Sequence, residues 1–281
     1  MKKAKVVLAG ALVLALGLVM GCGSPDTTQA SEGHVVREGN KYVHEWKTEY
    51  SNDNYYRSAL QFGKDDLLRK SPKVQNAEVT VELNFPADGK AGILFAVNNR
   101  EQTEGTESKK LYDFFAFAFG VNRGSPTKLE AYVDYYQGAT SIKDDGDNAA
   151  KPESFSTGKS FEVVKNNLDY EWNGKAVTMT MKIARNNNST ANDETDDYFT
   201  LTISDKNGNK VWEGDTKDVK SKLAEKGMIE DAYKITGGIF SYGMLSGAVK
   251  EKTANTVWTL NKDTLEPSGL MGGLNFAAEE E

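Results

Sequence analysis

Apolar and polar residues alternate with a period of two along much of this 281-residue chain. Such alternation predicts β-strands, because successive side chains of a strand point to opposite faces of its sheet. The clearest patterns predict strands over residues 77–85, 91–97, 111–120, 129–136, 177–184 and 198–203. Weaker patterns predict strands over residues 41–50, 154–164, 210–213, 234–241 and 255–260.

Turn residues separate these strands. Residues 86–89 (Pro-Ala-Asp-Gly) predict a hairpin between the first two clear strands. Asn207-Gly208 predicts another hairpin after residue 203, because this dipeptide favours the tight turns that join antiparallel strands. Polar composition predicts long loops over residues 98–110, 138–152 and 186–197.

One short helix is predicted over residues 217–226, with Asp215 or Thr216 as its cap and Gly227 at its end. About a dozen strands and one helix predict an all-β fold, an antiparallel β-sandwich. No Pro- or Gly-rich linker divides the body, so residues 41–265 are expected to form a single domain. Residues 266–281 are predicted to be a loose acidic tail.

The first 21 residues follow a different pattern. Three lysines precede an apolar run over residues 6–20, which suits the hydrophobic region of a signal peptide and is short for a membrane-spanning helix. The run ends in Val19-Met20-Gly21-Cys22, which resembles the lipobox of bacterial lipoproteins, although Met20 departs from the usual small or hydroxyl residue. The resemblance implies cleavage before Cys22 and lipidation of its thiol. An ordinary signal peptide and an uncleaved anchor are the alternatives.

Charge and cysteine content narrow the function further. A single cysteine excludes an internal disulfide framework, and a pI near 5.2 argues against nucleic-acid binding. Without the signal peptide, 31 basic and 41 acidic residues leave a net charge of −10, so the body is expected to stand off anionic lipid. Residues 22–40 are polar and predict a flexible tether from lipidated Cys22. Gly23, in place of the aspartate that signals inner-membrane retention, favours the outer membrane.

The order of the strand motifs resembles that of concanavalin-like jelly-roll domains, which include laminin-G-like modules and 3-keto-disaccharide hydrolase-type domains. The resemblance covers roughly residues 77–260. Its motifs are the segments 90–95, 112–117, 129–136, Trp172 with 177–182, 198–212, and 237–243 with 257–260. It implies a jelly-roll sandwich, in which the concave sheet of the related glucanases holds polysaccharide.

The sequence gives little support for catalysis. Glucanases of this fold carry closely spaced acids on one strand, whereas the nearest pair here, Glu130 and Asp134, lies ~13 Å apart along a strand. That separation exceeds what either glycosidase mechanism uses. The only histidines, His34 and His44, have no recognisable catalytic partner. A glycoside hydrolase or lyase is therefore the least favoured interpretation.

The strand over residues 129–136 is the best candidate for ligand binding. Glu130, Tyr132, Asp134 and Tyr136 share one face and are expected to form an exposed row. Tyrosine rings stack on apolar sugar faces and carboxylates accept hydroxyl protons, so the row suits a glycan. The alternative is a strand that simply presents its solvent side.

Two further features are candidate binding elements. Trp172 and Trp212 are more typical of core or rim packing than of sugar stacking. The family resemblance also raises rim calcium, for which residues 144–148 and 192–197 are the acid-rich candidates. Neither fits an EF-hand, solvated turns are the favoured interpretation, and no other cofactor is indicated.

The sequence as a whole predicts a lipid-anchored envelope protein whose domain binds a glycan or another surface polymer without catalysis. The alternative is a protein-interaction or structural lipoprotein that has no small ligand. The oligomeric state is not indicated by the sequence.

Overall fold

The computed structural model describes residues 34–49, 56–61, 74–84, 89–122, 125, 127–139, 159–187, 189, 196–229, 238–245, 253–264 and 266–267. Eight strands form one sheet: β1 (His34–Glu38), β2 (Lys41–Glu49), β4 (Val74–Asn84), β9 (Val177–Asn186), β10 (Tyr198–Asp205), β11 (Lys210–Asp215), β13 (Thr253–Asn261) and β14 (Glu266–Pro267). Six strands form the other: β3 (Tyr56–Gln61), β5 (Gly89–Glu104), β6 (Glu107–Val121), β7 (Lys128–Ala139), β8 (Lys159–Glu171) and β12 (Gly238–Leu245).

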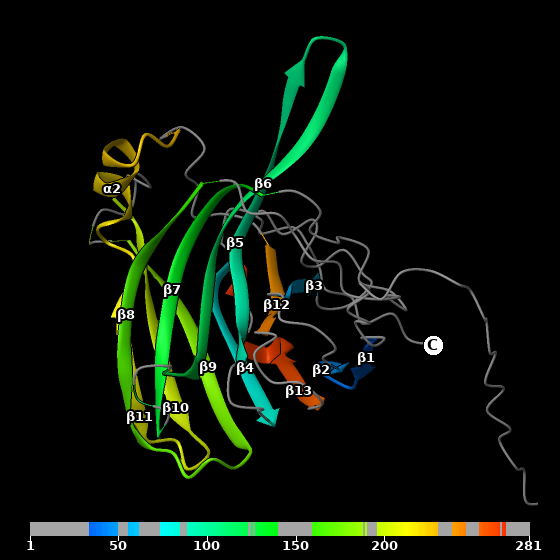
Figure 1. Cartoon of the computed structure of the whole chain (residues 1–281), viewed down its shortest axis with the longest axis vertical. Coiled ribbons are helices and arrows are strands. Elements are labelled where there is room, and N and C mark those ends of the chain that lie inside the picture. The colour runs from blue at the N-terminus through cyan, green and yellow to red at the C-terminus, as the bar shows by residue number, and fades with distance from the viewer. Residues whose placement is uncertain are drawn as a thin grey trace, which may run out of the picture.

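The two sheets are antiparallel and pack as a sandwich (Figure 1). The eight-stranded sheet has the order β1-β2-β13-β4-β9-β10-β11, with β14 paired to β4. The six-stranded sheet has the order β3-β12-β5-β6-β7-β8. The chain crosses between the sheets six times along its length, after β2, β3, β4, β8, β11 and β12. The prediction of an all-β antiparallel sandwich with one short helix is confirmed for the described residues.

Side-chain alternation gives the six-stranded sheet an inner and an outer face. On β6, Phe115, Phe117 and Phe119 lie in the core between the sheets, as the sequence predicts. Ala116 and Ala118 point the other way and belong to a second, smaller apolar cluster on the outer face. The core therefore sits between the sheets, and the outer face of the six-stranded sheet has apolar packing of its own.

The hairpin predicted at residues 86–89 is wrong. β4 pairs with β9 and β13 in one sheet, whereas β5 pairs with β6 and β12 in the other. The connection between β4 and β5 therefore crosses from sheet to sheet. Turn residues predict that the chain reverses there, but they do not determine which strands become neighbours. The Asn207-Gly208 hairpin is confirmed, with Gly208 at φ +84° between β10 and β11.

The loop predicted over residues 98–110 is also wrong, because this segment continues β5 and β6 as one long hairpin. The two strands stay paired from Asn98 with Asp113 out to Glu104 with Glu107. Gly105 takes the positive φ of +66° that two-residue hairpin turns require. Both faces of this ribbon meet water, so its sequence lacks the apolar alternation by which strands are recognised.

The predicted helix forms as α2 (Val219–Glu225), and Gly227 ends it at φ +59°. Its N-cap is Asp218 and makes no side-chain capping bond, so the predicted cap at Asp215 or Thr216 is wrong. Thr216 instead accepts the N–H of Phe199 through its hydroxyl, which holds the chain before the helix against β10.

The ends of the predicted domain also need adjustment. Residues 34–38 belong to the predicted flexible tether, residues 22–40. They form β1 instead, which pairs with β2 across a turn at Gly39. β14 likewise pairs with β4 inside the predicted loose tail. Cys22 and the signal segment lie outside the described residues. No helix among the described residues is long and apolar enough to span a membrane.

Candidate functional site

The acid and tyrosine row lies on β7, the fifth strand of the six-stranded sheet. Leu129, Ala131, Val133 and Tyr135 point into the core. Glu130, Tyr132, Asp134 and Tyr136 alternate with them and therefore share the outer face, as predicted. In the register, this row lies opposite Gly120, Ala118, Ala116 and Phe114 of β6. The small side chains of β6 leave space beside the larger groups of β7.

The expectation that this row is exposed is wrong for three of its four members. Glu130 is 5% exposed, Tyr132 6% and Tyr136 5%, while Asp134 is half-buried. Period-two alternation identifies the face of a strand, but it does not determine whether that face meets water. The outer face carries its own apolar cluster, which includes Leu94, Phe114 and Tyr136, and the row is packed among such groups.

Tyr132 lies at the centre of a charged group, which we call the Tyr132 cluster: Lys90, Glu130, Tyr132 and Lys165. The Tyr132 hydroxyl donates a hydrogen bond to Oε1 of Glu130. Lys165 Nζ lies 3.6 Å from the same carboxylate oxygen and 5.3 Å from the Tyr132 ring centroid. Lys90 Nζ lies 3.0 Å from that centroid, so two ammonium groups lie close to one ring. Both cations are placed to interact favourably with the negative face of the ring.

Three strands supply the Tyr132 cluster. Lys165 on β8 is the register partner of Tyr132 on β7, and Lys90 reaches across from β5. Neither lysine is predicted from the sequence. Neither lies near residue 132 in the chain, and only the strand order and register bring them together. No local sequence signal identifies this arrangement.

Burial raises the pKa of the Glu130 carboxyl above its usual value. The positive charges of Lys165 and Lys90 act in the opposite direction, and the nearby carboxylate of Glu162 adds to the rise. The carboxyl thus retains its proton to a higher pH than an ordinary glutamate. It lies next to a phenol and two ammonium donors.

The other two members of the row differ in character. Tyr136 stacks on Phe114 with ring centroids 5.1 Å apart, so it belongs to the apolar packing of the outer face. Asp134 lies opposite Glu162 across the β7–β8 pairing. The structure therefore brings Glu130 and Tyr132 together with two lysines. Tyr136 contributes to apolar packing, and Asp134 marks the more open side of the row.

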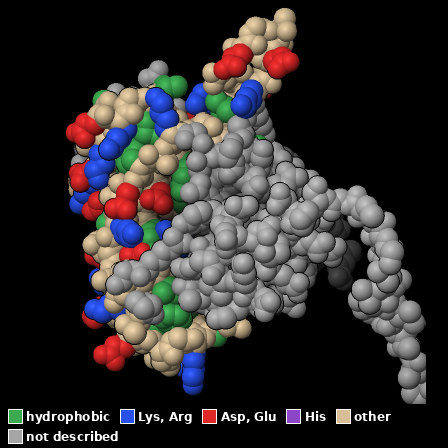
Figure 2. Space-filling model, in the orientation of Figure 1, with side chains coloured by type: hydrophobic (Ala, Val, Ile, Leu, Met, Phe, Trp, Pro, Cys, Tyr) green, Lys and Arg blue, Asp and Glu red, His purple; other side chains and the backbone are tan. Residues whose placement is uncertain are grey.

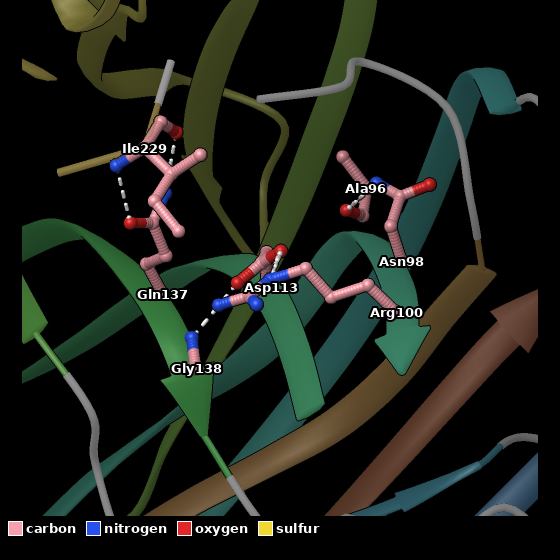
Figure 3. Close-up of polar contacts among 7 residues, drawn as sticks. All are labelled: Ala96, Asn98, Arg100, Asp113, Gln137, Gly138 and Ile229. Carbon is pink, nitrogen blue, oxygen red and sulfur yellow. Dashed lines mark hydrogen bonds and ion pairs between the residues drawn. The ribbon is translucent and has the colours of Figure 1, made fainter. Parts of the chain in front are cut away.

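A second polar cluster, which the sequence analysis missed, lies where β5 and β6 leave the sandwich (Figure 3). Asp113 is buried, and its carboxylate accepts the N–H of Gly138 at 2.8 Å and Nε of Arg100 at 3.1 Å. Gly138 has a φ of +75°, and the pairing of β6 with β7 shifts register beside Asp113. A bulge leaves some backbone groups without their partners in the neighbouring strand. The Asp113 carboxylate accepts a hydrogen bond from one such group, the Gly138 N–H.

The same level of the sheet is irregular on β5. Ala96 has a φ of +49°, the register with β6 shifts between Phe95 and Asn98, and the Asn98 amide donates to the Ala96 carbonyl at 2.7 Å. Gln137 of β7 makes two bonds with the backbone of Ile229, one accepting its N–H and one donating to its C=O (Figure 3). These side chains replace missing ladder bonds, so we interpret this cluster as structural support for the emerging hairpin.

No group of three or more His, Cys, Asp or Glu side chains in the described part of the chain is arranged to hold a metal ion. Of the two acid-rich candidates for calcium, residues 144–148 lie outside the described residues. In the second, Asp197 is buried and paired with Arg185, whose Nε lies 2.6 Å from Oδ2. An arginine already bound to this carboxylate opposes a cation there.

The two tryptophans considered as sugar platforms pack as core and rim residues. Trp212 is buried, with its ring 5.6 Å from that of Phe117. Trp172 is half-buried against the core, and its Nε1 donates to the Lys175 carbonyl at 2.8 Å. The core and rim interpretation of both residues is confirmed.

Comparison with known proteins gives no family assignment. No family model matches the chain, and no curated protein shows a significant sequence match. Among solved structures, alginate lyase vAL-1 from Chlorella virus gives a TM-score of 0.36 at 11% identity, covering 83% of this chain and 90% of that one. The kappa-carrageenase from Pseudoalteromonas carrageenovora, in complex with an oligotetrasaccharide of kappa-carrageenan, gives 0.33 at 9%, covering 84% and 87%.

A third solved structure, a bifunctional GH43-CE protein from Bacteroides eggerthii, gives a TM-score of 0.31 at 10% identity, covering 80% of this chain and 24% of that one. These TM-scores are too low to transfer a site or a reaction from one protein to another. The function of this chain is therefore argued from its own residues.

Proposed function

We propose that this chain is a lipid-anchored envelope protein whose sandwich binds a glycan or another hydroxyl-rich surface polymer through the Tyr132 cluster and Asp134. The observation that carries the proposal is the concentration of one phenol, one carboxyl and two ammonium groups on a sheet face that also carries a buried apolar cluster. Charged groups taken out of water cost free energy, so such a cluster is more typical of a binding site than of simple packing.

The chemistry of the cluster suits hydroxyl groups. The Glu130 carboxyl and Asp134 offer acceptors, and the lysine ammonium groups offer donors. A ligand can reach the cluster most easily from the β8 side, where the Lys165 side chain is 41% exposed and Asp134 is half-buried. A ligand therefore meets Lys165 and Asp134 first, with Tyr132 and Glu130 behind them.

A glycan array tests the binding proposal. The full chain, solubilised in detergent, is applied with and without the substitution Tyr132→Phe, which removes the hydroxyl that bonds Glu130 but keeps the ring. We expect the intact chain to retain a defined set of glycans and the variant to retain them more weakly. Tyr170→Phe, at a half-buried tyrosine of β8 that packs against the core, is the matched control. An array with no retained glycan contradicts the proposal.

The membrane anchor is proposed on the lipobox resemblance at Val19–Cys22 and is tested separately. Cys22→Ser removes the only thiol, and we expect it to move the protein from the detergent phase to the aqueous phase of a detergent partition. Ser24→Ala leaves the four-residue motif intact and is expected to partition like the parent chain. Equal partitioning of Cys22→Ser and the parent contradicts lipidation at Cys22.

Protein interaction is the second candidate function, and one specific feature favours it. The hairpin formed by the outer parts of β5 and β6 projects from the sandwich with nine consecutive exposed residues, Glu101–Lys109 (Figures 1 and 2). Such a projection adds nothing to the core, so its conformation needs another explanation.

A further inference from the structure

The outer part of the β5–β6 hairpin, residues 98–111, is here called the hairpin arm. It stands clear of the other described strands, with acidic and basic side chains along it (Figure 2). Every side chain from Glu101 to Lys109 is exposed. Residues 98–110 include no apolar aliphatic or aromatic side chain. The arm is therefore unsuited to an apolar groove, and any partner must meet its backbone and charges.

Both edges of the arm are unpaired among the described strands. β12 pairs with β5 only as far as Val97, and β7 pairs with β6 only as far as Tyr112. Beyond those points each strand of the arm has a single neighbour, which is the other strand of the arm. Outward N–H and C=O groups on such an edge form a template for another strand.

The base of the arm is held firmly, so its edges keep a defined direction. Arg100 of β5 is bound through Nε to the buried carboxylate of Asp113 on β6, which also accepts the Gly138 N–H from β7. Two side chains of the arm, Asn98 and Arg100, thus belong to the polar cluster of Figure 3. A two-stranded ribbon is marginal in water by itself, and this attachment supports it.

The β5 edge is complementary to itself. When two copies of one strand pair antiparallel about a two-fold axis, every contact occurs twice. If one residue of the first copy faces a second residue of the other copy, the reverse contact also forms. With Gln102 opposite Gln102, Arg100 of each copy faces Glu104 of the other, so the pairing contains two opposite-charge pairs on one face. Arg100 contacts Asp113 through Nε, so its outer guanidinium nitrogens remain for such a pair.

We propose that the hairpin arm joins two copies of this chain, by antiparallel pairing of the β5 edge over residues 100–104 with its register centred on Gln102. The β6 edge is less suited, because centring it on Lys109 sets two lysines against each other and centring it on Ser108 pairs fewer exposed residues. A contact of this size is weak in dilute solution. The proposed lipid anchor confines copies to one surface, which raises their effective concentration.

Thiol cross-linking in membranes tests this contact on the full chain. Gln102→Cys places a thiol at the two-fold axis, and a short bis-maleimide is expected to convert a large share of the protein to a covalent dimer. Asn207→Cys, at the exposed tip of the β10–β11 hairpin, is the matched control and is expected to remain monomeric. Equal cross-linking of the two variants, or none at Gln102→Cys, overturns the proposal.

The parent chain reports on the anchor in the same experiment. Its only thiol is Cys22, so a lipidated chain cannot cross-link. A cross-linked parent contradicts lipidation and not the arm, and the Gln102→Cys measurement is then repeated in a Cys22→Ser background at raised protein concentration. Dimer at Gln102→Cys in that background still supports the arm, and its absence there overturns it.

Charge reversal identifies the edge. Glu104→Lys, made in the Gln102→Cys chain, sets a lysine against Arg100 of the second copy and is expected to lower the dimer yield about fivefold or more. Glu107→Lys makes the same change on the facing strand of the arm, directly across from Glu104, and is expected to leave the yield unchanged. Loss with Glu107→Lys but not with Glu104→Lys moves the contact to the β6 edge and contradicts the proposed register.

Discussion

Trp258 of the eight-stranded sheet donates a hydrogen bond from Nε1 to the backbone carbonyl of Gly92 in the six-stranded sheet, at 2.6 Å. Trp258 is fully buried, so the bond crosses the core and links β13 directly to β5. Gly92 also lies close to the adjacent strand, where a Cβ would come within 2.0 Å of the Phe117 carbonyl oxygen. The indole and the glycine together fix how closely the two sheets and the strands β5 and β6 approach.

Trp258→Phe is expected to lower the free energy of unfolding by about 2–4 kcal/mol, because it leaves a buried carbonyl with one fewer donor and a smaller ring in the core. Urea denaturation followed by circular dichroism measures the change. Trp172→Phe loses a comparable indole bond that is exposed to water, at a half-buried residue, and is expected to cost about 1 kcal/mol or less. Equal losses in the two variants would show that the inter-sheet bond adds nothing.

Gly92→Ala is expected to be more damaging than an alanine at an open glycine. The new methyl group collides with backbone of β6, which cannot move without separating paired strands. Gly208→Ala is the comparison, since Gly208 has a positive φ of +84° but no atom within 4 Å of its would-be Cβ. That variant is expected to cost about 1 kcal/mol from backbone strain alone. A Gly92→Ala protein with the stability of Gly208→Ala contradicts the close approach.

Two ion pairs that begin on β9 are expected to differ sharply in their effect. Arg185→Ala leaves the buried Asp197 carboxylate without its partner, and Oδ1 of Asp197 has no other described hydrogen bond. We expect a loss of about 3–5 kcal/mol in the free energy of unfolding. Lys182→Ala breaks the exposed pair with Glu78 and is expected to cost about 0–1 kcal/mol. Similar denaturation midpoints for both variants contradict the assigned burial of Asp197.

The raised pKa of Glu130 predicts a pH dependence of stability. The folded state holds this proton more tightly than the unfolded state, so folding is favoured below the ordinary pKa of the group and this advantage is lost as pH rises through the folded-state pKa. Glu130→Gln keeps an acceptor for Tyr132 and cannot ionise. The stability of the parent relative to Glu130→Gln is therefore expected to fall between pH 3.5 and pH 7, measured by urea midpoints in the same buffers. A relative stability that rises over this range contradicts the assigned direction.

Much of the fold was predictable from the alternation of the sequence. The three core phenylalanines of β6 and the shared face of Glu130 and Tyr132 follow from period two alone. Two failures have one physical cause. The burial of the Glu130–Tyr136 row and the strand structure of residues 98–110 both depend on which groups lie beside the strand. The alternation of residues within one strand carries no information about those neighbours.

The composition of the candidate site was less predictable than its location. Lys165 and Lys90 join Tyr132 only through the register of β8 with β7 and the position of β5 two strands away. The polar cluster around Asp113 arises from bulges, whose positions depend on tertiary pairing. In retrospect, an aspartate within the aromatic run over residues 111–119 was a signal, because a buried acid requires a specific partner.

The affinity of the full chain for a glycan that it selects on an array tests the binding account most directly, with Lys165→Ala and Lys182→Ala compared side by side. Both remove a partly exposed lysine that is paired with a glutamate, but only Lys165 belongs to the Tyr132 cluster. The account predicts that Lys165→Ala weakens binding about tenfold or more, as expected for loss of a charged hydrogen bond, and that Lys182→Ala leaves it unchanged. Equal affinities for the parent and Lys165→Ala would contradict the account.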